Sequence, residues 1–241
     1  VEPIIYNPPF SFSGLANPVS VNTDDVWSPI VPLPFDFCFF GNTYNECVIG
    51  SNGILSFNTS LAGNSSGYSF NNNIPISGDT VLRENSIFGV FHDINPGVGG
   101  EVGWELVNLP TGCRALVASW SNVPMFDENA ILYTGMMVLY ENSNIIEVYI
   151  QEKNIDNFGA GTWNGGNAIV GIQNASGDDK DECTEGESVS SGNSPLSSSD
   201  NKRTTSLKTK NDEYEVRQLL HHERVSDSLK GRQGSASSGV D

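Results

Sequence analysis

The segment HDINPGVGGE, residues 92–101, carries the side chains of this sequence best suited to hold a metal ion. Asp93, Asn95 and Glu101 offer hard oxygen atoms in a loop rich in Gly and Pro, and calcium takes roughly six to eight such oxygens. These three residues are therefore calcium candidates. Asp93 and Asn95 are also typical of Asx turns ahead of Pro96. We favour the turns, because three ligands are too few for calcium and the spacing is not that of an EF-hand.

Catalytic chemistry has little support in the first 177 residues. Their single histidine is His92, and Ser51 and Ser119 lack the G-x-S-x-G turn that exposes a nucleophile. Glu105 and Glu147 are carboxylates of the type that glycosidases pair, but each lies in a strand-like run, where an outward-facing charge is the simpler interpretation. We therefore expect no enzyme and no cofactor, with calcium as the one open alternative.

Two of the cysteines flank a predicted hairpin. Cys38 and Cys47 lie on either side of a turn that we expect to centre on Asn42 and Thr43. In that register the two face each other across the strands, as a disulfide requires. Two independent thiols fit the pattern equally well. The cysteines contain no C-x-x-C pair, which speaks against structural zinc.

The charge balance limits the kinds of partner. Twelve Lys and Arg stand against 29 Asp and Glu, for a net charge of −17. Nucleic acids and anionic membrane surfaces attract basic proteins, so neither is an expected partner. The longest apolar run is shorter than the roughly 18 residues of a membrane span. Low Lys with abundant Asn, Ser and Gly favours an extracellular protein, in which a disulfide persists.

The first 177 residues read as a series of short strands. Runs rich in Val, Ile, Phe, Tyr and Trp are separated by Gly, Asn, Pro and Asp. The segment YENSNII predicts a tight hairpin at residues 141–144. This pattern predicts an all-β domain, an antiparallel sandwich of jelly-roll type. The strand-like runs cover residues 35–41, 47–57, 85–94, 101–107, 113–123, 131–141, 144–152 and 167–175.

The composition changes near Gly177. Residues 178–241 are rich in Ser and poor in aromatics, so we expect a largely disordered tail after a β domain at residues 1–177. Apolar residues at loosely helical intervals indicate one short helix within the tail, over residues 212–230.

Several sequence blocks, in their order, resemble the nidogen-type extracellular domain. They are VIGSNGILSF, VFHDINPGVGGEVGWEL, CRALVASWSNV, MMVLYENSNIIEVYIQ and GNAIVGIQN, and they cover roughly residues 28–177. The versions most similar are those of secreted Bacteroidota surface proteins, which often end in a type IX secretion sorting domain. The resemblance implies a β-rich, non-enzymatic domain of adhesion or matrix-type proteins, located outside the cell or on its surface. Asp93 matches a characteristic acid of the family.

Two functions follow as hypotheses. The first is a non-catalytic cell-surface domain that binds an extracellular protein or glycan through the loops around Asp93 and Met125–Phe126. The second is a carbohydrate-active domain, either lectin-like or a jelly-roll hydrolase, in which Trp163 stacks on a sugar ring. The same fold class serves both.

Overall fold

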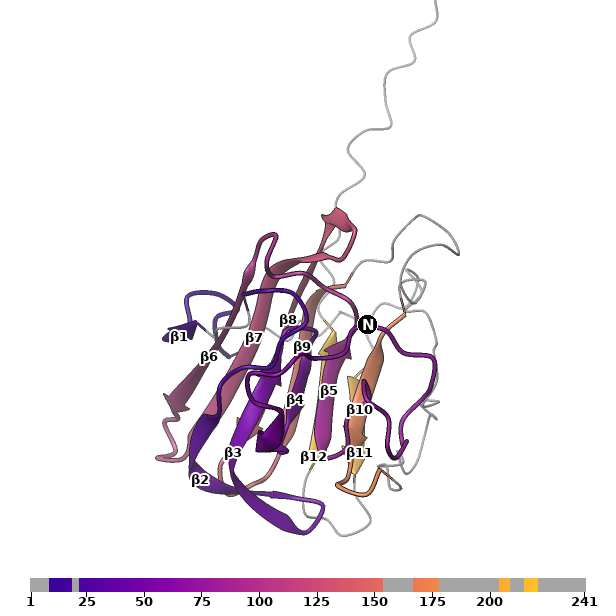
Figure 1. Cartoon of the computed structure of the whole chain (residues 1–241). Coiled ribbons are helices and arrows are strands. Elements are labelled where there is room, and N and C mark those ends of the chain that lie inside the picture. The colour runs from indigo at the N-terminus through magenta and orange to yellow at the C-terminus, as the bar shows by residue number, and fades with distance from the viewer. Residues whose placement is uncertain (1–8, 19–21, 154–166, 178–203, 209–214, 221–241) are drawn as a thin grey trace, which may run out of the picture.

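A computed structural model describes the chain except for residues 1–8, 19–21, 154–166, 178–203, 209–214 and 221–241. In the described part the strands form two sheets, which Figure 1 shows as two layers. One sheet has the order β1-β6-β7-β8-β9-β12-β11 and the other β10-β5-β4-β3-β2. The strands are β1 (Asn17–Pro18), β2 (Val31–Phe39), β3 (Asn42–Gly50), β4 (Ile54–Ser56), β5 (Ser86–Phe91), β6 (Glu101–Asn108), β7 (Arg114–Met125), β8 (Glu128–Tyr140), β9 (Ile146–Lys153), β10 (Ile169–Gln173), β11 (Thr204–Lys208) and β12 (Glu215–Leu220), with one 3-10 turn at Thr59–Leu61. The predicted all-β sandwich is confirmed.

Alternating side chains build the core between the two sheets. In β2, residues 31, 33, 35, 37 and 39 are apolar and buried, while the residues between them point outward. The exposed Pro32 and Pro34 are tolerated because β2 is an edge strand, where a missing N–H leaves no ladder bond unmade. Trp120 of β7 reaches across the core and donates from Nε1 to the carbonyl of Gly50 in the facing sheet, at 3.2 Å.

Both outer faces are covered as well. Residues 57–85 pack over the five-stranded sheet and contribute Phe70, Ile74 and Leu82 to a second apolar cluster, together with Trp27 and Phe88. Over the seven-stranded sheet, the segment before β1 contributes Leu15, Phe10 and Phe12 to a third cluster with residues of β7, β8 and β9. β5 is buried on both of its faces, which explains why its sequence is an almost continuous apolar run rather than an alternating one.

The β2–β3 hairpin turns two residues earlier than the sequence predicts. Phe40 and Gly41 have φ values of 48° and 71°, the left-handed pair of a two-residue turn. This register sets Cys38 opposite Thr43, and after an irregularity in the ladder it sets Cys47 opposite Val31. Cys47 is buried in the core, whereas Cys38 lies on the other face of its strand. Of the two alternatives left open by the sequence, the Cys38–Cys47 disulfide is therefore wrong, since the two thiols are neither opposed nor on one side of the sheet.

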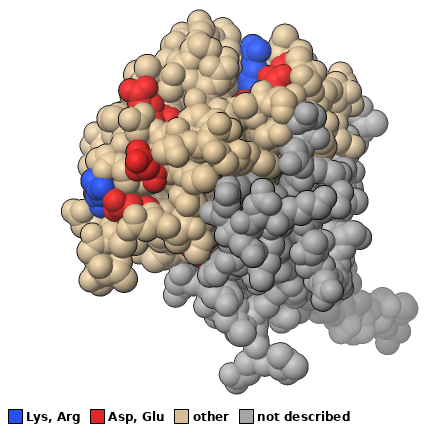
Figure 2. Space-filling model, turned by 90° about the horizontal axis from the view of Figure 1, so that it is seen from below, with Lys and Arg blue, Asp and Glu red and all other residues tan. Residues whose placement is uncertain are grey.

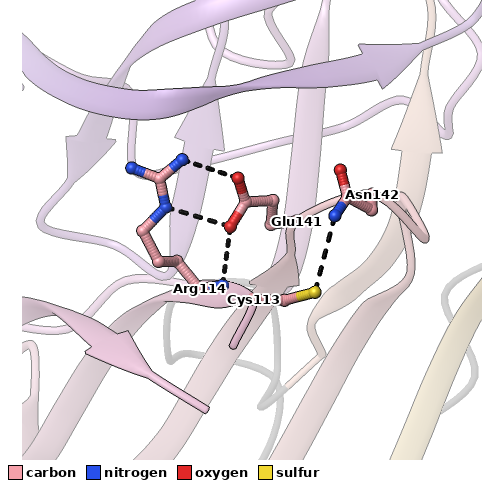
Figure 3. A network of polar contacts seen from close by, with 4 residues as sticks. All are labelled: Cys113, Arg114, Glu141 and Asn142. Atoms are coloured by element: carbon pink, nitrogen blue, oxygen red, sulfur yellow. Dashed lines mark hydrogen bonds and ion pairs between the residues drawn. The ribbon is translucent and has the colours of Figure 1, made fainter. Parts of the chain in front are cut away.

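The predicted hairpin at residues 141–144 joins β8 to β9 and meets the β2–β3 hairpin at one end of the sandwich. Asn144 accepts a hydrogen bond from the backbone N–H of Cys38 at 2.9 Å. Beside it, Arg114 holds Glu141 with two side-chain bonds of 2.9 and 2.6 Å, and Asn142 donates to the sulfur of Cys113 (Figure 3). Figure 2 views this lower end of the molecule, where each group of blue basic atoms lies next to red acidic ones.

Two segments of the predicted tail join the seven-stranded sheet. β12 pairs in parallel with β9, and β11 pairs with β12. Residues 215–220 are therefore extended, and the predicted helix over 212–230 is wrong there; its other residues lie outside the described part. An isolated helix of this length is marginal in water, whereas the edge of β9 offers a full row of unpaired backbone groups.

Candidate functional site

The end of the sandwich opposite the β2–β3 turn brings together four segments far apart in the sequence. The chain reverses at residues 51–53 between β3 and β4, and β5 ends beside this turn because it runs antiparallel to β4. Residues 24–27 lie against the same turn, through backbone bonds such as the one from Ser51 N–H to the Val26 carbonyl at 2.9 Å. We call residues 22–26, 51–53, 92–100 and 124–127 together the acidic end.

Asn52 connects these segments. Its side chain is 0% exposed and donates to Asp25 and to the carbonyl of Gly67, each at 2.9 Å. Its side-chain oxygen accepts from the N–H of Ile94 at 3.2 Å, and its own carbonyl accepts from the N–H of His92. Asn52 therefore fixes the position of Asp25 through its side chain, and the residues on both sides of Asp93 through its side-chain oxygen and its backbone carbonyl.

Three carboxylates converge at the acidic end. One oxygen from each of Asp24, Asp25 and Asp93 lies within 4.8 Å of the other two. Asp24 and Asp25 are half-buried, and Asp93 is only 5% exposed. Asn95 donates to Oδ2 of Asp24 at 2.9 Å, across 71 residues of sequence. The group is a compact set of hard oxygens held by two amide side chains.

The electrostatics of the group follow from its burial and from its like charges. Burial, followed by the charges of Asp25 and Asp24, raises the pKa of Asp93 from 3.8 to about 7. Burial first, and then Asp25, also raise the pKa of Asp24, and burial raises that of Asp25. Oδ1 of Asp24 and Oδ1 of Asp93 are buried and lack a hydrogen-bond partner among the described residues. The cluster therefore has acceptor capacity that no described donor fills.

Only part of the predicted calcium set lies at this site. Asp93 and Asn95 belong to the acidic end, Asp93 as a member of the cluster and Asn95 as a donor to it. Glu101 does not join them, since its carboxylate accepts from the backbone N–H of Gly14 at 2.9 Å. Sequence reasoning missed Asp24 and Asp25. The adjacent acids in NTDDVW were a signal, but nothing local indicated that Asp93 would lie beside them.

The loop after β7 is attached to the same place. The N–H of Asn95 donates to the Pro124 carbonyl at 2.8 Å, and the N–H of Phe126 donates to the Asp93 carbonyl at 3.2 Å. The two loops nominated from the sequence are therefore neighbours. Met125 is buried, whereas Phe126 is half-buried and Val98 is 54% exposed. Side chains reach solvent here from a backbone that hydrogen bonds hold in place.

His92 lies in the core rather than in an accessible site. Its Nδ1 carries the proton, since it lies 2.8 Å from the Val90 carbonyl, which can only accept. Its ring packs edge-on against Tyr133 at 4.8 Å, and burial lowers its pKa well below the ordinary value. Its other ring nitrogen, Nε2, is buried and has no hydrogen-bond partner among the described residues, so it activates no serine or cysteine there.

The two strand glutamates are likewise separated. Glu105, Val117, Val138 and Glu147 form one row across β6, β7, β8 and β9. Three strand spacings put the backbones of Glu105 and Glu147 roughly 14 Å apart, wider than the roughly 5–10 Å between the carboxyl groups of glycosidases. Glu147 is also buried, and it accepts hydrogen bonds from the hydroxyls of Tyr140 and Tyr149 at 2.6 and 2.7 Å. Trp163 lies outside the described residues.

Comparison with known protein families identifies the family to which this chain belongs. The model of the NIDO-related family matches residues 7–217, which is most of the chain. The chain belongs to the NIDO-related family. No curated protein and no solved structure matches it. The family indicates a domain of extracellular type, in agreement with the resemblance seen in the sequence blocks. None of the helical segments in the described residues has the length and hydrophobicity that a membrane crossing requires.

In this NIDO-related domain the sequence blocks that carried the resemblance hold the sandwich together. Asn52 of GSNG fixes the acidic end, and Trp120 of the WSNV block bonds across the core. Gln173 of VGIQN is 0% exposed and donates to the carbonyls of Leu82 and Arg83 at 2.9 and 2.8 Å. Asp93 of FHDI stands apart, because it combines burial with an oxygen that has no described donor.

Proposed function

We propose that this chain is a non-catalytic interaction domain of a secreted surface protein, which mediates adhesion by binding an extracellular protein or glycan. The observation that carries the proposal is the match to the NIDO-related family over residues 7–217. The sequence blocks further resemble those of bacterial surface proteins. Fold alone does not select a function, so the proposal also rests on the site.

The acidic end supports binding better than chemistry. Its loops present the exposed Val98 and the half-buried Phe126 on a backbone fixed by bonds to Asp93 and Pro124. Loops positioned by a rigid scaffold are the usual location of binding residues in β-sandwich domains. In the described part, the candidate catalytic residues are either buried in the core or too far apart to act together. We therefore assign partner binding to the acidic end.

The test compares one substitution at the two ends of the sandwich. Val98→Arg places a large cation on the proposed binding surface, and Thr43→Arg places it on an exposed position beside the β2–β3 turn. Beads that carry the purified wild-type protein or a variant are incubated with arrays of extracellular proteins and of glycans, and the number of beads bound to each array spot is measured. We expect saturable binding by the wild-type protein, strong loss with Val98→Arg and retention with Thr43→Arg.

Two results would argue against this function. Equal binding by both variants would remove the acidic end as the contact surface. Release of reducing sugar from an arrayed glycan would replace the proposal with the carbohydrate-active alternative. Binding to glycans without release of sugar would identify the partner class within the proposal.

A further inference from the structure

The carboxylates of the acidic end form no ion pair with a basic side chain of the described residues. Asp24, Asp25 and Asp93 lie within 4.8 Å of one another, and the one ion pair of the described part, Arg114–Glu141, lies at the opposite end of the sandwich. Like charges at this distance repel, more strongly where burial reduces solvent screening. Such a group is stable only if its charge is neutralised by protons or by a cation.

Two orphaned oxygens distinguish this group from an ordinary acidic surface. Asp93 is 5% exposed, and its Oδ1 has no donor within hydrogen-bonding distance among the described residues. Oδ1 of Asp24 is also buried without a donor. Buried polar atoms nearly always have a partner, so two exceptions in one cluster indicate a ligand. Because carboxylate oxygens present lone pairs, that ligand is electron-poor.

We propose that Asp24, Asp25 and Asp93 bind a divalent cation of calcium type. All three ligands are hard carboxylate oxygens, and neither a histidine nor a cysteine belongs to the cluster, which disfavours zinc and other transition metals. Calcium accepts irregular sets of oxygens and fills the remaining positions with water, whereas magnesium demands a nearly ideal octahedron. Two of the three aspartates are half-buried, so the ion has a path from solvent.

The surrounding amides orient the ligands. Asn52 donates to Asp25 and Asn95 donates to Asp24, each at 2.9 Å. Hydrogen bonds of this kind fix a carboxylate so that its other lone pairs face the ion. Bound at this position, the cation ties residues 24–25 to the end of β5, two segments that already share contacts with Asn52. Binding therefore stabilises the acidic end.

The test is calorimetric titration of the chelator-stripped full chain with Ca²⁺ to roughly 5 mM, since extracellular calcium modules bind in the range of about 0.1–1 mM. We expect one equivalent of Ca²⁺ per chain and a melting temperature that rises with Ca²⁺ concentration. Asp93→Asn and Asp24→Asn each remove one negative charge from the ligand set at constant shape and should weaken binding about tenfold or more. Glu101→Gln removes the same charge outside the cluster and should bind like the wild type.

Several outcomes would overturn the site. These are a titration without heat together with an unchanged melting temperature, or binding that survives both Asp93→Asn and Asp24→Asn. Loss of binding in Glu101→Gln alone would move the site to the ligand set suggested by the sequence. Equal affinity for Mg²⁺ and Ca²⁺ would contradict the calcium-type assignment. Melting curves in chelator show separately that each variant is folded.

Discussion

Gln173 is predicted to be among the most important polar side chains for the stability of this domain. It lies at the end of β10 with 0% exposure and forms three hydrogen bonds to the segment that covers the outer face of the five-stranded sheet. Its Oε1 accepts from the N–H of Ile76 at 3.0 Å, and its Nε2 donates to the carbonyls of Leu82 and Arg83. The proposed perturbation is Gln173→Met, which keeps length and approximate volume but removes all three bonds.

The expected loss of stability follows from the hydrogen bond that each partner of Gln173 loses. The carbonyl of Leu82 is bonded in a buried position, and leaving such a group without a partner costs about 1–3 kcal/mol. The bonds to Ile76 and Arg83 are partly buried, and each contributes about 1 kcal/mol. We expect Gln173→Met to lower the free energy of unfolding by about 3–5 kcal/mol in total, which corresponds to a melting temperature lower by roughly 10 °C.

The assay is urea unfolding at 25 °C followed by tryptophan fluorescence, because Trp27 and Trp120 are fully buried and report the loss of the core. Gln151→Met is the matched control, since Gln151 is exposed in β9 and the same substitution there should change stability by less than about 0.5 kcal/mol. Equal unfolding midpoints for the two variants would refute the reasoning, because burial and hydrogen bonding are what distinguish the two positions.

Three further predictions concern other parts of the molecule. Gly53→Ala should destabilise by about 3 kcal/mol in urea unfolding, since Gly53 has φ +80° and an added Cβ would overlap the carbonyl oxygen of Val90; a neutral result would contradict the turn geometry. With chelator present, the stability of the wild type relative to Asp93→Asn should fall as pH rises from about 4 to 8, because folded Asp93 keeps a proton up to about pH 7 that the unfolded chain releases near 3.8. The comparison with the variant is needed because the lowered pKa of buried His92 acts on total stability in the opposite direction. The full shift of Asp93 corresponds to about 4 kcal/mol, which solvent near its half-buried partners reduces to about 2; parallel profiles of the two proteins would count against this assignment. Burial raises the pKa of the Cys47 thiol, so peptide mapping after iodoacetamide treatment should find Cys47 labelled only once urea unfolds the protein, whereas the half-buried Cys113 reacts in the native state; early labelling of Cys47 would show that the core is open.

The sequence by itself determined the local structure of the β region. Runs rich in Val, Ile, Phe, Tyr and Trp, separated by Gly, Asn, Pro and Asp, predicted the strands from β2 to β10, because both signals are local properties of the chain. The hairpin at residues 141–144 was also predicted from local sequence, because asparagine adopts the positive φ values seen at Asn142 and Asn144 at low energetic cost. The order of the blocks was sufficient to indicate the family as well.

The tertiary structure decided register, edges and the candidate site. The turn at Phe40–Gly41 moved the ladder by two residues and separated Cys38 from Cys47, because Gly41 and the strand twist favour that turn over the Asn42–Thr43 alternative. Residues 215–220 became a strand because β9 offered an open edge, which no local pattern in the tail encodes.

At the acidic end, the contributions of the local sequence and of the tertiary structure are the easiest to separate. The sequence indicated that Asp93 lies after a strand in a turn-rich loop. That Asp24 and Asp25 lie beside it follows from the buried Asn52. Its side-chain amide bonds to Asp25 and to the N–H of Ile94, and its backbone carbonyl accepts from the N–H of His92. Carboxylates so distant along the chain converge because satisfying one buried amide draws three segments together, and that requirement exists only once the sheets have packed.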